Sequence, residues 1–227
     1  MTTILHVVTN VAHFDDPDET TGLWLSELTH AWHVFEEHGF NQKIISPAGG
    51  YVPLDRRSLT FPAKEATAES WLTDPARMAL LGDTTAAADV DAADVDAIYF
   101  AGGHGAMYDF PDNRDLQRLS RDILERGGIV SSVCHGYCGL LNTRMSDGSL
   151  LLDGREITGF SWREEKLAFV DKLVPYNVEE VSRERGAVHR KATLPFASYT
   201  VSDGTLITGQ NPASAKATAE LVAAALS

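Results

Sequence analysis

Hydrophobic positions along this chain form two patterns, short continuous runs and longer stretches with helical spacing. The runs ILHVVT (4–9), KIIS (43–46), IYF (98–100) and IVSSV (129–133) predict buried strands. Leu25, Leu28, Trp32 and Phe35 recur at helical spacing within 22–39, and segment 113–128 is amphipathic and ends in paired glycines. Strands that alternate with helices predict a mostly parallel sheet covered on both faces.

The remaining segments complete this alternation. A loop rich in glycine and proline covers 48–64, and an Ala- and Asp-rich stretch that ends near Val90 reads as helical. Further on we expect a strand in GREITGFS (154–161), helical pieces at 162–170 and 178–186, a hairpin with an Asp-Gly turn at 198–209, and a helix at 211–227. No repeat or linker interrupts the pattern, which predicts one domain over residues 1–227.

Composition narrows the classes of partner. The chain has 227 residues and a net charge of −13, with acidic residues spread along it, which argues against nucleic acid and anionic membranes as partners. No apolar run is long enough to span a membrane, and the first strand begins at Ile4 without a signal peptide, so we expect a cytoplasmic protein. Two cysteines four residues apart indicate neither a structural disulfide nor a zinc site.

Candidate chemistry centres on Cys134. The strand 129–133 ends abruptly in Val-Cys-His-Gly, and a sharp strand-to-helix turn exposes the side chain at its apex. A helix N-terminus at that point would favour the thiolate, which makes Cys134 a candidate nucleophile rather than an inert buried thiol. His135 either turns its ring back to the thiol or only shapes the loop. Cys138 lies one helical turn onward, where packing is the simpler role and redox chemistry the alternative.

Polar groups elsewhere supply possible partners for this thiol. Glu27 interrupts an apolar helix face, so it is either a buried, protonated acid or an ordinary solvated residue. Glu164 and Glu165 follow a strand end, where one of them could orient a histidine or both could favour the helix dipole. The loop AGGHG offers backbone N–H groups for an oxyanion at the residues Gly102, Gly103 and His104.

Together these segments resemble the ThiJ/PfpI superfamily, whose fold is similar to that of flavodoxin and of class I glutamine amidotransferases. The similarity rests on TGLWLSELTHAWHVFEEHGF, ISPAGG with VPLDRRSL, DAIYFAGGHGAMYDFPDN, GGIVSSVCHG, ITGFSWREE and DGTLITGQNPASA, which run nearly end to end. Within the superfamily, the chain is similar to heat-shock chaperones with glutathione-independent glyoxalase (glyoxalase III) activity. The resemblance implies a flavodoxin-like three-layer α/β sandwich and a homodimer.

The resemblance also implies roles for individual residues. Cys134 matches the family nucleophile, His135 its neighbouring histidine, and Glu27 the acid that contacts the sulfur. The acid that orients the histidine matches Glu165, with Glu164 as the alternative register. The pocket loop falls on Gly103 and His104, whereas Tyr137 departs from the family pattern and is expected to narrow the pocket.

The implied reaction converts a small aldehyde, methylglyoxal, to lactate through a Cys134 hemithioacetal and an enediol, with no metal and no cofactor. A glutaminase-type amidotransferase fits less well, because its late His-x-Glu is replaced here by His189, Arg190 and Lys191. A cysteine peptidase or amidase, an isonitrile hydratase, a stress chaperone and an oxidation sensor are the alternative functions.

Overall fold

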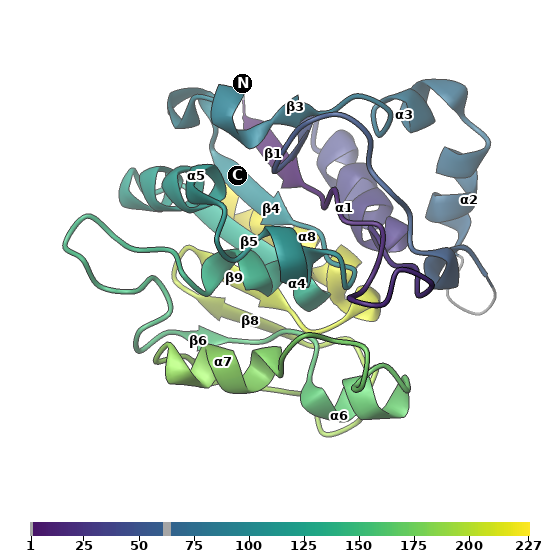
Figure 1. The fold of residues 1–227 in the computed structure, drawn as a ribbon. Coiled ribbons are helices and arrows are strands. Elements are labelled where there is room, and N and C mark those ends of the chain that lie inside the picture. Colours follow the sequence, from purple (N-terminus) through teal and green to yellow (C-terminus); the bar gives the residue numbers. More distant parts are fainter. Residues whose placement is uncertain (1, 61–64) are drawn as a thin grey trace.

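A seven-stranded sheet forms the centre of the computed structural model, which describes residues 2–60 and 65–227 (Figure 1). Its strand order is β3-β2-β1-β4-β5-β9-β8, and only the β8–β9 pair among these neighbours is antiparallel. The strands are β1 (Thr3–Val7), β2 (Asn41–Ser46), β3 (Thr85–Ala86), β4 (Ala97–Phe100), β5 (Ile129–Val133), β8 (Thr200–Asp203) and β9 (Leu206–Gly209). The predicted mostly parallel α/β sheet is confirmed.

Helices cover both faces of this sheet. One face carries α1 (Leu25–Glu37), α2 (Ala66–Leu72) and α8 (Ala215–Leu226), with α1 packed directly against α8. The other carries α4 (Ala106–Asp109) and α5 (Arg114–Glu125). Helix α5 begins where the Asn113 side chain accepts hydrogen bonds from the N–H groups of Asp115 and Leu116, which caps its first turn.

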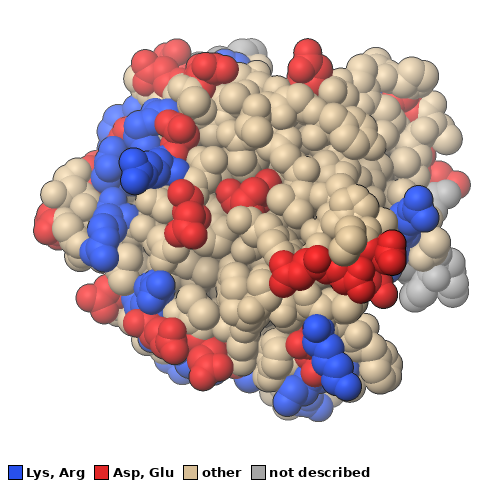
Figure 2. Space-filling view, in the orientation of Figure 1, with Lys and Arg blue, Asp and Glu red and all other residues tan. Residues whose placement is uncertain are grey.

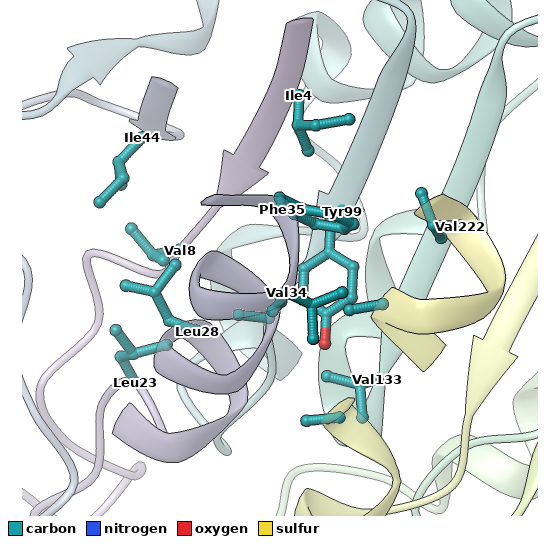
Figure 3. Close-up of a cluster of buried hydrophobic side chains, with 14 of the residues drawn as sticks. Ile4, Val8, Leu23, Leu28, Val34, Phe35, Ile44, Tyr99, Val133 and Val222 are labelled. Carbon is teal, nitrogen blue, oxygen red and sulfur yellow. The ribbon is translucent and has the colours of Figure 1, made fainter. Parts of the chain in front are cut away.

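Strand periodicity divides the core into two clusters. Along β4, Ala97 and Tyr99 face the cluster under α1 and α8, whereas Ile98 and Phe100 face the cluster under α5. Figure 3 shows the first cluster, in which Tyr99 lies beside Phe35 of α1. All four strand residues are fully buried, as expected for a parallel sheet that is covered twice.

A smaller layer lies beyond the antiparallel edge (Figure 1). It contains α6 (Trp162–Leu167), α7 (Val178–Glu184) and a two-stranded sheet of β6 (Glu156–Ile157) and β7 (Val188–His189). The strand predicted in GREITGFS is therefore only two residues long and lies outside the central sheet. Its backbone is tied to that sheet by the Thr158 N–H, which donates to Thr208 Oγ1 at 2.9 Å.

The prediction of one helical stretch ending near Val90 was wrong. That region contains α2, α3 (Pro75–Ala79), the edge strand β3 and short 3₁₀ turns. Asp74 caps α3 ahead of Pro75, which ends the preceding helix and starts a new one. The predicted loop at 48–64 is described as far as Thr60, and its last four residues lie outside the described residues.

Surface charge agrees with the acidic composition. Figure 2 shows Asp and Glu side chains scattered over one face, with most of its Lys and Arg side chains gathered beside α5. Within the described part of the chain, no helix combines the length and the apolar character needed to cross a bilayer.

Core packing predicts the effect of truncating a buried side chain. Leu119 of α5 is fully buried, so Leu119→Ala should lower the free energy of unfolding by about 2–5 kcal/mol through lost contacts and a cavity. Leu221→Ala on α8 is the control, because that side chain is 38% exposed. Urea denaturation measures both, and equal losses in the two variants would contradict this account of the core.

Candidate active site

The turn that follows β5 places Cys134 at the carboxyl edge of the sheet. A 3₁₀ helix, η4 (Cys134–Leu140), starts directly at the strand end, and Cys134 itself has a φ of 55°. This conformation is strained for a residue with a side chain and is typical of functional sites. Gly136 permits the turn, because a Cβ atom there would lie 2.1 Å from the Phe100 carbonyl oxygen of β4.

Glu27 reaches the site from the first turn of α1. It is fully buried, and its Oε2 accepts a hydrogen bond from the Gly102 N–H at 2.7 Å. The carboxyl group also interacts with the Cys134 thiol, and by geometry Oε1 has no hydrogen-bond partner within the described residues. Burial raises the pKa of Glu27 to about 8, although the contacts with Cys134 and Gly102 oppose the shift. Glu27 is therefore an acid that holds its proton at neutral pH.

His135 turns its ring back to the thiol. Its Nδ1 lies 3.3 Å from Cys134 Sγ, and its Nε2 lies 2.6 Å from Glu165 Oε1. A carboxylate accepts at that distance, so Nε2 carries the hydrogen and Nδ1 presents its lone pair to the thiol. Burial alone would raise the pKa of Glu165, but His135 and His104 hold it below its usual range. The geometry is that of a nucleophile, a base and an orienting acid.

Glu164 has a different place in the structure. With Ser161 it forms the capping box that starts α6, and its Oε1 accepts from Asn211 Nδ2 and the Phe196 N–H. Of the two adjacent glutamates, Glu165 is thus the one brought to His135.

His104 enters the site through its side chain rather than its backbone. Its Nε2 lies 3.0 Å from Glu165 Oε2, and its ring centroid lies 4.1 Å from that of His135. On its other side, Nδ1 lies 3.1 Å from Arg57 Nη2. Burial, followed by the nearby His135 ring, lowers the pKa of His104 to about 4, so the ring is neutral.

A cavity of about 140 Å³ opens above the sulfur. Gly103 forms part of its wall with a φ of 107°, where a Cβ atom would lie 2.1 Å from the Gly22 carbonyl oxygen. Most of the surface is apolar, and beside Gly103 the cavity is lined by Trp24, Arg57, His104, Cys134, His135, Phe160, Ala168, Phe196 and Pro212. The thiol and His135 therefore face a small, largely apolar space.

Burial works against ionisation of the Cys134 thiol. Burial raises the pKa of the thiol, and so does an ionised Glu27 carboxylate, whereas the backbone N–H of His135 lowers it. The element that follows the strand is a 3₁₀ helix buried in the protein rather than an exposed α-helix. Sequence reasoning missed this because burial of the strand end depends on the surrounding layers.

Other expectations about the pocket also change. The Gly102 N–H is bonded to Glu27 and is not free for an oxyanion. Tyr137 does not line the cavity; its ring packs in the cluster under α5, against Gly159, and its hydroxyl donates to the Phe160 carbonyl at 3.1 Å. Cys138 is fully buried in the same cluster, in agreement with a packing role.

One group of site residues has the composition of a metal site. His104, His135 and Glu165 bring one possible ligand atom each within 4.8 Å of one another. These atoms are already joined by the hydrogen bonds to Glu165, and the Arg57 guanidinium contacts His104. A cation next to that guanidinium is disfavoured, so the cluster fits a hydrogen-bond network better than a metal.

Sequence reasoning missed several residues that shape the site. Arg57 lies in the VPLDRRSL segment, where two adjacent arginines give no sign of which one points inward. Phe160 lies just before α6 and Phe196 lies in the loop between β7 and β8, and apolar residues in loops have no period to mark them.

Comparison with known proteins shows the family of this chain. A model of the DJ-1/PfpI family matches residues 20–225. The chain belongs to the DJ-1/PfpI family. The resemblance predicted from the sequence motifs is thereby confirmed. A glutathione-independent glyoxalase of Schizosaccharomyces pombe is 32% identical over 92% of this chain and 91% of its own length.

Two solved structures are similar over nearly the whole chain. The 24 kDa rapid encystment protein of Francisella tularensis is 35% identical, with a TM-score of 0.95 and complete coverage of both chains. Glyoxalase III of Candida albicans is 29% identical, with a TM-score of 0.89 over 99% of this chain and 97% of its own.

Protonation of Glu27 predicts how stability depends on pH. The unfolded chain releases this proton near pH 4.5 and the folded chain near pH 8, so the free energy of unfolding should fall between those values by up to roughly 1.4 kcal/mol per pH unit. Glu27→Gln should flatten this decline and stabilise the protein most at pH 8.

Thermal unfolding from pH 5 to pH 9 measures the effect. Glu37→Gln at the exposed end of α1 is the control and should keep the wild-type slope. A Glu27→Gln profile parallel to that of the wild type would mean that Glu27 is already ionised in the folded protein.

Proposed function

We propose that this protein is a glutathione-independent glyoxalase that converts methylglyoxal to lactate. The observation that carries the proposal is the position of the Cys134 sulfur, between His135 Nδ1 at 3.3 Å and the Glu27 carboxyl, on the floor of a small cavity. One nucleophile thus contacts two groups that can carry protons. The glyoxalase names of relatives that match nearly the whole chain support the same reaction.

Addition of the thiol to the aldehyde is the first step. His135 Nδ1 takes the proton from Sγ as the sulfur bonds to the aldehyde carbon, and the imidazolium then gives that proton to the aldehyde oxygen to form a hemithioacetal. The Glu165 carboxylate stabilises the imidazolium formed in this step, because it accepts from His135 Nε2 at 2.6 Å. The distance of 3.3 Å between Sγ and Nδ1 is short enough for this proton transfer.

Proton transfer between the two carbons is the second step. His135 Nδ1 removes the hydrogen from the hemithioacetal carbon while protonated Glu27 gives its proton to the ketone oxygen. The enediol then takes the proton from His135 at the second carbon and returns the hydroxyl proton of the first carbon to Glu27, which gives a thioester. Glu27, with a pKa raised to about 8, is suited both to give and to accept a proton near neutral pH. Water then cleaves the thioester to lactate and restores the thiol.

Backbone groups of the β4 loop complete the site. Gly103 lines the cavity, and its N–H is the candidate donor to the oxyanion of the hydrolysis step, a contact worth roughly 2.7–4 kcal/mol in comparable enzymes. Gly102 instead holds Glu27 in place.

The size and lining of the cavity support a small substrate. A volume of about 140 Å³ is well below the roughly 300–1,000 Å³ of pockets for drug-sized ligands. A glutathione adduct or a peptide therefore does not fit inside, whereas methylglyoxal does. This favours a small carbonyl over the peptidase alternative.

The homodimer expected from the family is part of the same proposal. Phe169 is 87% exposed and Leu194 is 70% exposed, and apolar side chains of this kind are commonly covered by a partner subunit. Light scattering on the purified protein tests the dimer independently of the activity.

Loss of the nucleophile should abolish the activity. We expect Cys134→Ala to reduce conversion of methylglyoxal to lactate by at least about a thousandfold, because the covalent route is removed. Cys138→Ala is the matched control and should keep near wild-type turnover, since that thiol lies outside the cavity.

Lactate formed from methylglyoxal without glutathione is the measured product, and glutamine and peptide amides are assayed in parallel. Equal turnover by the wild type and Cys134→Ala would refute the proposed mechanism, and amide hydrolysis without lactate formation would favour a cysteine hydrolase.

A further inference from the structure

A chain of hydrogen bonds lies behind Cys134 and His135. Three of its members, Asp55, Arg57 and His104, have no role in the reaction described above. It runs from Asp55 through Arg57 and His104 to the outer oxygen of Glu165. We propose that Arg57, held by Asp55, is a positioning residue that fixes the tautomer of His104 and, through Glu165, keeps the lone pair of His135 directed at Cys134.

The direction of each hydrogen bond follows from the arginine. A guanidinium has only donors, so at the 3.1 Å contact Arg57 Nη2 donates and His104 Nδ1 accepts. A neutral imidazole that accepts at Nδ1 carries its hydrogen on Nε2. His104 Nε2 therefore donates to Glu165 Oε2 at 3.0 Å. One tautomer of His104 satisfies both contacts, and the other satisfies neither.

Asp55 makes Arg57 a fixed donor. The carboxylate is fully buried and accepts from the backbone N–H, Nε and Nη2 of Arg57 as well as from Thr21 Oγ1. The guanidinium also lies over the Phe14 ring, 5.5 Å from its centroid. A side chain held by a planar two-point contact and a ring loses little freedom when it donates to a third group.

The consequence for catalysis lies at Glu165. Its two oxygens accept one N–H each, from His135 at Oε1 and from His104 at Oε2, and the centroids of the two rings lie 4.1 Å apart with the ring planes tilted by 39°. If His104 took the other tautomer, a nitrogen lone pair would face Oε2 and repel the carboxylate. Glu165 would then move to find another donor, and His135 would lose the contact that orients Nδ1 toward the thiol.

The neighbouring arginine provides a matched control. Arg56 and Arg57 are consecutive residues of the same 3₁₀ turn, η1 (Arg56–Leu59), but Arg56 is exposed and does not line the cavity. Arg57→Met removes all donors of the side chain and keeps most of its apolar stem, whereas Arg57→Lys keeps a cationic donor. Arg56→Met removes one positive charge from the same 3₁₀ turn without touching the cavity, so it measures the effect of that charge loss alone.

The proposal rests on the glyoxalase function for one of its readouts but not for the other. The first readout is kcat for methylglyoxal, and the second is the rate at which iodoacetamide alkylates Cys134, which reports activation of the thiol whatever the natural substrate is. We expect Arg57→Met to lower both by roughly tenfold to a hundredfold, Arg57→Lys to restore part of each loss, and Arg56→Met to leave both unchanged. If the wild-type protein formed no lactate, the proposed function would be wrong. The alkylation rates would still show whether Arg57 positions His104 and Glu165.

A double-mutant cycle tests whether Arg57 acts through His104. In a His104→Asn background, Arg57→Met should cost little more, because the ring that it orients is gone. Fully additive losses of activity would contradict the proposal, since they would mean that Arg57 acts independently of His104.

Nitrogen-15 NMR of the wild-type protein tests the tautomer directly, without a variant that must fold. We expect His104 as a neutral ring with its hydrogen on Nε2, and a mixture of tautomers in Arg57→Met. A wild-type His104 with its hydrogen on Nδ1 would overturn the proposal, and so would a wild-type alkylation rate in folded Arg57→Met.

Discussion

The close approach of two backbones at the carboxyl edge of the sheet determines the arrangement of this site. Only a glycine at position 136 lets η4 lie against the Phe100 carbonyl, and this contact forces the chain to turn at Cys134 with a positive φ. The turn places the thiol over the end of β5 and under the loop that follows β4. Every other group of the site reaches the sulfur from an element packed around that turn, so its geometry depends on the sheet rather than on a flexible loop.

Burial and hydrogen bonding shift the pKa values of the two carboxyl groups near the sulfur in opposite directions. Glu27 is surrounded by apolar layers and receives one backbone N–H, so burial raises its pKa to about 8. Glu165 is also buried, but it accepts from two histidines that hold its pKa below the usual range. One acid keeps a proton that it can exchange near neutral pH, and the other stays ionised to orient a base. Such a separation of environments is how a site holds an acid and a base of the same chemical type.

Much of this organisation was accessible from the sequence. The alternation of strands and helices predicts the parallel sheet, and the abrupt end of IVSSV predicts the turn at Cys134. Resemblance to the family supplied Glu165 and left Glu164 as the alternative. The sequence Ser161-x-x-Glu164 is the signature of a capping box, which would have committed Glu164 to the start of α6 and left Glu165 for the histidine.

Other properties depend on contacts between distant segments. The amino-acid sequence by itself determined the sheet and the turn that carries Cys134 and its neighbour His135, because these follow from local periodicity and adjacency. The tertiary structure decided that Cys134 and Glu27 are buried, that Tyr137 faces away from the cavity, and that Arg57 rather than Arg56 reaches His104. Protonation and hydrogen-bond direction depend on which groups are buried together, and the packing of η1, α1 and α6 around one strand end brings those groups into contact.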